Sequence, residues 1–377
     1  MKILVYGSGK IKYMPYLNFY LDNLDRIKND VHLLYWNNDL KNEDTSNLKN
    51  ITLHEFKFYQ EDEISKLFKI KGYYKFRKFV KEILKKEKFD IIIVLHSLTG
   101  VIIFDKLLKY KNRYIFDYRD STYENFFIFK FLIGKLVKNS IITFVSSDGF
   151  RKFLPQNLEK KIFTSHNLLV DSLNHRKDRE NNKIKSDKIR IVFWGFIRNE
   201  EINLEIIRKI SLDNRFELHY YGREQQTALN LKKYVEINNI KNVFFHGEYN
   251  PNERYNFICK TDIIHNIYYD NNMMLAMPNK YYDGIIFKIP QICMKDSFMG
   301  KMVTNANVGL TCNPYEKNFL EQIYNYHKNF NYKKFKEFCD IELKRIMNEY
   351  NVGVHLQKDI YNFENIKLGG KNVFIKR

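Results

Sequence analysis

Short apolar runs rich in β-branched residues recur along the first half of the chain, and most are followed by a stretch long enough for a helix. Runs of this kind predict strands that are buried on both faces. The predicted strands cover residues 2–7, 31–36, 51–56, 90–95, 113–118, 141–145 and 161–165. Because helix-length segments separate them, the pattern indicates a parallel sheet covered by helices on both sides.

A polar, highly charged stretch interrupts this pattern between residues 171 and 188, and the alternation then restarts. The second set of predicted strands covers residues 189–195, 216–222, 242–247, 262–269, 289–294 and 308–312, with helices that include 203–210 and 231–238. We therefore predict an α/β protein with two doubly wound, Rossmann-like domains that face a cleft.

The predicted organisation is an N-terminal domain at 1–175, a linker at 176–188 and a C-terminal domain at 189–350. The remaining residues, 351–377, follow helices that begin near residue 319. We expect this tail either to cap the second domain or to cross back to the first. A length of 377 residues also favours two cores over one.

The charge of the chain changes this picture by pointing to a partner. It has 63 basic and 44 acidic residues, a net charge of +19, which indicates nucleic acid, a lipid surface or a phosphorylated small molecule. Alternatively, the lysine excess is part of a general composition that is also rich in Asn, Ile, Tyr and Phe.

The four cysteines form no CxxC pair, which fits a reduced, cytosolic protein without a zinc site. We expect no export signal and no membrane span, because no apolar run is long enough.

Polar residues follow two strands of the predicted first sheet. His96 ends one strand and is suited to act as a base, to hydrogen-bond a hydroxyl group or to cap the next helix. Asp120, Arg119 and Glu124 follow the next strand. Asp120 or Ser121 is suited to cap the following helix, with Glu124 supporting the cap, and we expect at least one of the acids to face the cleft as well.

The second predicted sheet ends in glycines. Gly195 precedes Arg198 and a helix, and a helix N-terminus beside an arginine suits a diphosphate. Gly222 and Gly247 each end a strand, where glycine lets the backbone approach a flat ligand such as a base. The glycines at the start of the chain, Gly7 and Gly9, lack the third glycine of a dinucleotide-binding fingerprint.

An apolar helix near residue 280 begins with polar groups, in the stretch MPNKYYDGIIFKIPQI. Pro278 suits the first helical position, Lys280 and the helix amides could take phosphate charge, and Asn279 lies beside them. Asp283, about one turn further on, could accept two hydrogen bonds from a ribose diol.

These motifs resemble those of GT-B glycosyltransferases, in particular the family 4-like enzymes of bacterial capsule and surface polysaccharide assembly. The stretch PNKYYDGIIFKIPQI is similar to the family's Pro-x-Lys-x-x-Glu helix and Gly-x-Pro strand, and Asp283 and Pro290 fall on its glutamate and proline. The resemblance departs at Asp283, which replaces the usual glutamate, and at Leu275, where many members have a second glutamate. Glu200 and Glu201 occupy the region of a usual lysine.

The resemblance implies transfer of a sugar from a UDP- or GDP-sugar to a hydroxyl group of a lipid-linked saccharide, with no metal or other cofactor. The implied donor-binding residues are Gly195, Arg198, Gly222, Gly247, Tyr249, Asn279, Lys280 and Asp283. His96 and Asp120 would be catalytic, and Arg119 and Glu124 would contact the acceptor. The alternatives are a sugar-nucleotide epimerase of the same fold and a basic nucleic-acid-binding protein.

A basic and aromatic segment at residues 66–89 predicts contact with an anionic membrane. It has ten Lys or Arg against two Glu, a net charge of +8, with aromatic residues between them. The protein would then lie in the cytoplasm, peripheral to the inner face of the cell membrane. The alternative is an amphipathic helix that packs on the sheet and leaves its basic face in water.

Overall fold

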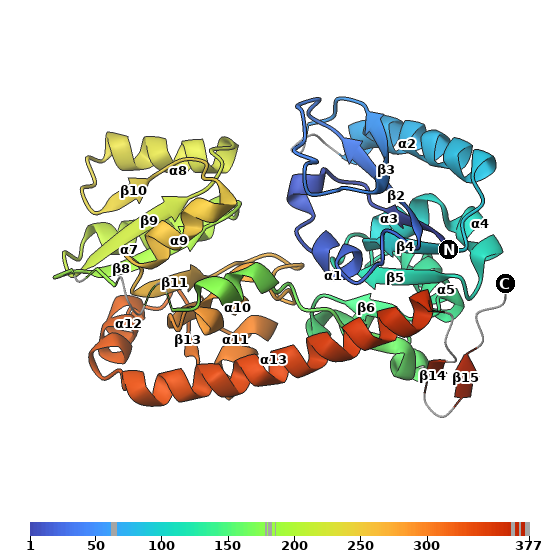
Figure 1. Ribbon diagram of the computed structural model, residues 1–377. Helices are drawn as coiled ribbons and strands as arrows, with labels where there is room; N and C mark the ends of the chain where they lie inside the picture. Colours follow the sequence, from blue (N-terminus) through green and yellow to red (C-terminus); the bar gives the residue numbers. More distant parts are fainter. Residues whose placement is uncertain are drawn as a thin grey trace. The chain divides into compact units, whose positions relative to one another are not determined.

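The computed structural model describes residues 1–61, 66–177, 179, 183–184, 186–362, 366–368 and 371–373. The chain divides into two compact units, one made of Met1–His166 with Asn348–Arg377 and the other of Asn167–Met347 (Figure 1). The sequence-based boundary at 175 thus lies inside the second unit. The segment from Asn348 onward groups with the first unit, although it follows the second in the chain.

The first unit is built on a seven-stranded parallel sheet in the order β3-β2-β1-β4-β5-β6-β7. Each of its strands matches a strand predicted from the sequence. The strands are β1 Lys2–Tyr6, β2 Asp30–Asn37, β3 Ile51–Lys57, β4 Ile91–Leu95, β5 Tyr114–Tyr118, β6 Thr143–Val145 and β7 Ile162–Thr164. The order reverses between β1 and β4, and such a switch point is where open α/β sheets bind ligands.

Helices cover the faces of this sheet. They are α1 Leu17–Leu21, α2 Lys66–Lys86, α3 Ser97–Ile102, α4 Phe104–Leu107 and α5 Phe127–Asn139, with 3₁₀ helices η1 Ile11–Tyr13, η2 Leu108–Tyr110, η3 Asp148–Phe153 and η4 Gln156–Lys161. Side chains alternate between the two faces along each strand. On β1, Ile3 and Val5 belong to a core that also contains Phe19 of α1 and Ile360 near the end of the long helix α13 Tyr332–Tyr361.

The opposite face of the sheet receives α2, the helix of the predicted membrane segment. Phe76 is buried and its ring stacks on Trp36 of β2 and Tyr6 of β1, with centroids 5.2 and 5.7 Å away. Tyr73 packs on Trp36 as well. Much of the aromatic content of this segment therefore packs on the sheet, which is the alternative that the sequence left open.

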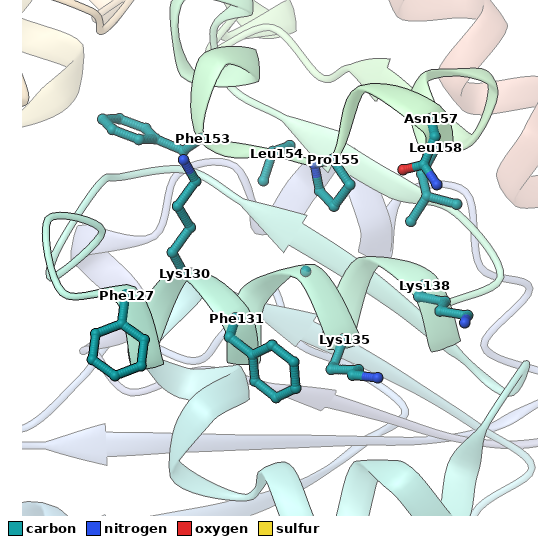
Figure 2. Close-up of a pocket in the computed structure, with 11 residues that line it drawn as sticks. Phe127, Lys130, Phe131, Lys135, Lys138, Phe153, Leu154, Pro155, Asn157 and Leu158 are labelled. Carbon is teal, nitrogen blue, oxygen red and sulfur yellow. The ribbon is translucent and has the colours of Figure 1, made fainter.

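Next to this face, α5 and η4 border a hollow of about 510 Å³ (Figure 2).

The sequence predicted a cap at Asp120 or Ser121 for the helix after β5. That prediction is wrong, because α5 begins at Phe127, with Phe126 as the residue before it, and residues 121–126 form turns.

The second unit has a six-stranded parallel sheet in the order β10-β9-β8-β11-β12-β13. Its strands are β8 Ile189–Trp194, β9 Phe216–Tyr221, β10 Val243–Phe245, β11 Ile263–Asn266, β12 Gln291–Met294 and β13 Gly309–Cys312. Its helices are α7 Glu200–Ser211, α8 Gln226–Ile237, α9 Arg254–Ile258, α10 Asn279–Ile286, α11 Phe298–Asn305, α12 Phe319–Lys328 and the first part of α13, with 3₁₀ helices η5 Val170–His175 and η6 Pro251–Glu253. A short antiparallel pair, β14 Ile366–Leu368 and β15 Lys371–Val373, follows α13.

The predicted linker at 176–188 contains a buried anchor. Arg179 is about 1% exposed, and its guanidinium donates to the carbonyls of Thr261 and Lys288 at 3.1 and 3.0 Å. Arg179 can therefore lie in the interior of the second unit although it comes from a polar stretch, because backbone carbonyls accept hydrogen bonds from its guanidinium.

Among the described residues, no helix has the length and apolarity that a membrane span requires.

Candidate functional site

Three glycines extend the strands of the second sheet at their carboxyl ends. Gly195 has φ +113° and Gly247 has φ +75°, and nothing lies within 4 Å of the position that a Cβ would take at either. At Gly222 a Cβ would lie 2.0 Å from the carbonyl oxygen of Gly195. The amide of Gly222 donates to Gly247 at 2.8 Å, so the predicted glycines lie side by side. Only a residue without a side chain fits such backbone.

The side chain of Asn203, which the sequence analysis did not single out, holds the turn before α7. The Nδ2 group of this buried side chain donates to the carbonyls of Arg198 and Asn199 at 2.8 and 3.1 Å. Its Oδ1 accepts from the Tyr220 hydroxyl at 2.8 Å and bonds His265 Nε2 at 3.1 Å. Asn203 thus connects the backbone beside Arg198 to Tyr220 of β9 and His265 of β11.

His265 has a neutral ring that serves this network. Burial lowers its pKa to about 3, and the positive charge of Lys280 acts in the same direction. Its Nδ1 accepts from the amide of Ile267 at 3.1 Å, so Nε2 carries the proton and donates to Asn203.

The loop that leads into α10 is attached to the start of α7. Asn199, the left-handed residue before α7 with φ 61°, donates to Asp270 Oδ2 at 3.2 Å. The other oxygen of Asp270 accepts from the amides of Asn272 and Met273 at 3.1 and 2.8 Å. These bonds attach the loop at residues 270–273, which precedes α10, to the start of α7.

Lys280 lies in the first turn of α10, close enough to Arg198 for the two charges to interact. Pro278 precedes the first helical residue and Asn279 is that residue, one position later than predicted. Lys280 is 4% exposed, and its Nζ lies 3.2 Å from the centroid of the Phe193 ring and 4.9 Å from that of Tyr268. Within the described parts of the chain it makes no hydrogen bond. Burial puts its pKa well below 10.5, and Arg198 lowers it further.

Asp283 lies deeper in the unit than a ligand-facing carboxylate would. It is 1% exposed, its Oδ2 accepts from Trp194 Nε1 at 3.1 Å, and Arg254 Nη1 is 3.6 Å away. Burial raises its pKa, and Arg254 counteracts this. Its contact with ribose stays a prediction. The sequence analysis missed Arg254, because no local motif connects it to Asp283, 29 residues further along the chain. Arg254 Nη2 donates to Ser172 Oγ at 2.8 Å.

Tyr249 completes this cluster. Its ring packs edge-on against Phe257 with centroids 5.2 Å apart. Burial raises the pKa of Tyr249 to about 12, Arg254 opposes the shift and Asp283 adds to it. Arg198, from the turn before α7, and Asp283 of α10 both act on Lys280, and Asp283 also acts on Tyr249. These predicted donor residues therefore lie near one another.

In the first unit, His96 and Asp120 form a pair at the carboxyl ends of β4 and β5. His96 Nε2 lies 3.2 Å from Asp120 Oδ2, while Nδ1 accepts from the amide of Leu98 at 3.3 Å. His96 therefore also caps α3, and both of its ring nitrogens have partners. Its φ of 83° is rare for a residue with a side chain, and strain of this kind is common at functional sites.

Arg119 and Glu124, the predicted acceptor contacts, have partners inside the first unit. Arg119 is buried, donates from Nε to Asp117 Oδ2 at 2.8 Å and lies 3.8 Å above the Tyr16 ring. Glu124 accepts from the Tyr118 hydroxyl at 2.7 Å. Both side chains are thus engaged in holding the chain after β5, and their contact with an acceptor stays a prediction.

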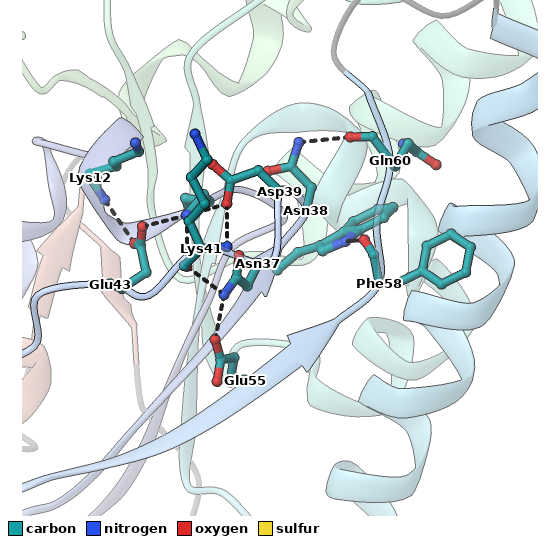
Figure 3. Close-up of polar contacts among 11 residues, drawn as sticks. Lys12, Asn37, Asn38, Asp39, Lys41, Glu43, Glu55, Phe58 and Gln60 are labelled. Carbon is teal, nitrogen blue, oxygen red and sulfur yellow. Dashed lines mark hydrogen bonds and ion pairs between the residues drawn. The ribbon is translucent and has the colours of Figure 1, made fainter.

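A polar cluster that the sequence analysis did not single out lies at the carboxyl ends of β2 and β3 and in the segments that follow β1 and β2 (Figure 3). Lys10 is fully buried and pairs with Asp39 and with Glu43, the latter at 3.2 Å. Asn37 donates to Glu55 Oε1 at 2.7 Å and to the carbonyl of Lys41 at 2.9 Å. These contacts order the strand-end loops of the first sheet.

Within the residues described, no group of three or more His, Cys, Asp or Glu side chains could hold a metal ion.

Comparison with known proteins identifies the fold. No protein-family model matches the sequence, and no curated protein does. Sucrose-phosphate synthase from Thermosynechococcus elongatus matches with a TM-score of 0.69 at 10% identity, over 96% of this chain and 98% of that one. HepE from Anabaena, in complex with UDP-glucose, matches with a TM-score of 0.65 at 10% identity, over 94% and 99%. A protein from Listeria monocytogenes that is assigned as a UDP-N-acetylglucosamine 2-epimerase matches with a TM-score of 0.59 at 12% identity, over 90% of this chain and 90% of that one.

The chain therefore has the GT-B fold, with two doubly wound α/β units of seven and six parallel strands. The predicted fold class is confirmed in these features.

Proposed function

We propose that this protein is a glycosyltransferase that uses a nucleotide-diphosphate sugar, with UDP or GDP as the nucleotide. The observation that carries the proposal is Lys280, a buried lysine without a hydrogen bond among the described residues, beside Arg198 and at the N-terminal end of a helix. Burying a cationic group without a partner is costly, so an anionic ligand is the natural occupant of this position. The match to HepE with bound UDP-glucose supports the same class of donor.

In the proposed reaction, the bond from the sugar C1 to the diphosphate oxygen breaks and a bond from C1 to the acceptor oxygen forms. Negative charge grows on the leaving diphosphate. Arg198, Lys280 and the amides at the start of α7 would stabilise that charge, as fixed cations and dipoles do in other transferases. We expect these groups to replace a metal ion, which predicts transfer that continues in the presence of EDTA.

The acceptor hydroxyl must lose a proton during transfer. We assign that proton to Asp120, because both ring nitrogens of His96 already have partners and His96 can position the carboxylate. Asp283 would hold the ribose only if its carboxylate turns from Trp194, so we assign it to donor binding and not to bond-making.

For the acceptor, we infer a lipid-linked saccharide of capsule or surface polysaccharide assembly, handled in the cytoplasm at the inner face of the membrane by a family 4-like enzyme. The support is the motif at residues 278–292 and the basic charge of the chain. A lipid-linked substrate requires the enzyme to reach a bilayer, and a net charge of +19 favours an anionic one.

A thermal-shift screen tests the donor. UDP, GDP, CMP and their sugars are added to the wild-type protein and to Lys280→Met. A ligand at about 100 times its dissociation constant stabilises the folded state by about 2.7 kcal/mol. We expect one of the diphosphate nucleotides to raise the melting temperature of the wild type only. If no nucleotide shifts it, the proposal fails.

A sugar-nucleotide epimerase is the second candidate, favoured by the match to the Listeria protein. An epimerase interconverts two nucleotide sugars and needs no acceptor. Incubation of the wild type with the stabilising nucleotide sugar alone, followed by NMR of the sugar, separates the two functions. A new epimer without added acceptor would favour the epimerase, whereas nucleotide release that depends on acceptor would favour the transferase.

A further inference from the structure

Helix α5 carries apolar side chains on two sides. Phe129, Ile133, Leu136 and Val137 are buried and pack into the first unit. Phe127 and Phe131 are instead 82% and 59% exposed, and Phe126 and Ile128 beside them are exposed too. One apolar side is sufficient for a helix that packs on a sheet. The second, outward side therefore has no role within the described fold.

The outward side of α5 borders the hollow of about 510 Å³. Its opposite wall is formed by residues 153–158, which contribute Phe153, Leu154, Pro155 and Leu158 (Figure 2). The two walls come together at Gly134, where a Cβ would lie 3.5 Å from Pro155 Cγ. The result is an apolar groove that opens beside exposed aromatic rings, and exposed apolar surface of this kind indicates a binding site.

The charged residues that line this groove are all lysines. Lys130, Lys135 and Lys138 lie along it, and α5 contains no acidic residue. Lys135 Nζ is 5.2 Å from the centroid of the Phe131 ring, and Lys152 Nζ is 5.0 Å from that of Phe153. Lys161 is different, because its Nζ donates a hydrogen bond to the carbonyl of Lys138 at 3.1 Å and so helps to hold the end of α5.

We propose that this surface, formed by α5 and residues 153–158, docks on an anionic lipid bilayer. Phe127 and Phe131 would enter the boundary between headgroups and acyl chains, and the lysines would lie among the lipid phosphates. Aromatic side chains combined with lysines are typical of helices that lie in the membrane interface, and the charge complements anionic lipid. The inference deepens the proposed function by naming the surface that brings the protein to its lipid-linked acceptor.

Sedimentation with vesicles tests the inference without donor or acceptor. Vesicles of phosphatidylcholine with about 30% phosphatidylglycerol are compared with pure phosphatidylcholine, at low and high salt. We expect the wild type to bind the anionic vesicles, and Phe127→Ser with Phe131→Ser to weaken this binding at least 10-fold. Lys130→Gln with Lys138→Gln should weaken it as well and reduce its dependence on salt.

Helix α2 provides the matched control, because Phe68 and Tyr74 are 76% and 69% exposed on the segment that the sequence favoured. Phe68→Ser with Tyr74→Ser should bind vesicles like the wild type. The inference is overturned if the α5 variant binds as well as the wild type, if the α2 variant alone loses binding, or if no vesicle binds the wild type, which would leave a protein partner for the groove. Circular dichroism and thermal denaturation show that each variant is folded, and nucleotide binding is measured in parallel. Vesicle binding without any nucleotide binding would refute the proposed function only.

Discussion

The ammonium group of Lys280 lies 3.2 Å from the centroid of the Phe193 ring, in the interior of the second unit. Contact with a ring replaces only part of the hydration that a lysine loses on burial. The buried group is therefore suited to bind an anion. In the free protein it should lower the free energy of unfolding, and this effect can be measured as a dependence of stability on pH.

Replacement of Lys280 by Met should change how stability depends on pH. Because burial makes the folded-state pKa lower than 10.5, the unfolded chain binds more protons between the two values. The free energy of unfolding of the wild type should therefore rise with pH within that window, and the slope should be smaller in Lys280→Met. Denaturant titrations at several pH values check this. Lys301→Met, at an exposed position of α11, is the control and should keep the wild-type slope.

Arg198→Ala should lower kcat for sugar transfer about 100-fold or more, the scale of one lost charge partner in the transition state. The measurement is initial-rate kinetics with the donor found in the thermal-shift screen. Arg208→Ala, at an exposed position in the last turn of α7, the helix that follows Arg198, should leave kcat unchanged. An Arg198→Ala enzyme with wild-type kcat would remove Arg198 from the site.

Asn203→Ala should destabilise the protein by about 1–3 kcal/mol, because it leaves buried partners such as the Tyr220 hydroxyl without a hydrogen bond. It should also weaken nucleotide binding, since the backbone beside Arg198 loses its support. Chemical denaturation and calorimetry measure the two effects. Asn238→Ala, an exposed asparagine after α8, should cost less than about 0.5 kcal/mol. Loss of stability with unchanged nucleotide affinity would contradict the positioning role.

Asp120→Asn should reduce transfer about 100-fold and leave nucleotide affinity unchanged, because Asp120 lies in the first unit and acts on the acceptor. Kinetics and calorimetry on the same preparation provide both numbers. Glu159→Gln, in the exposed part of η4, changes charge in the same way without touching the pair and should be neutral. If Asp120→Asn weakens nucleotide binding instead, Asp120 does not have the proposed role.

The fold could be predicted from the sequence because its strands are continuous apolar runs, and all seven strands of the first sheet were found in this way. The start of α5 could not. Asp120 and Ser121 offered good caps, yet the chain after β5 turns because Glu124 bonds Tyr118 and the amide of Thr122. Such tertiary hydrogen bonds leave no trace in local sequence.

The candidate site shows the same limit. Arg198, Lys280 and the three glycines could be proposed from the sequence because they follow strands or begin helices, and residues at the carboxyl ends of strands lie at the ligand-binding edge of an open sheet. Asn203 and Arg254 were missed, since their partners are distant in sequence. Asp283 was identified by its motif, but its burial against Trp194 depends on a contact that the motif does not contain.

The end of α13 has a consequence for how the protein is made. Ile360 and Tyr361 are part of the core of the first unit, and a Cβ at Gly353 would lie 2.8 Å from the Phe19 ring. The N-terminal sheet emerges from the ribosome long before these residues do. Until α13 has left the ribosome, the part of this core that α13 covers is open although α1 packs on the same face, so ribosome-bound chains that stop before α13 should be targets for chaperones.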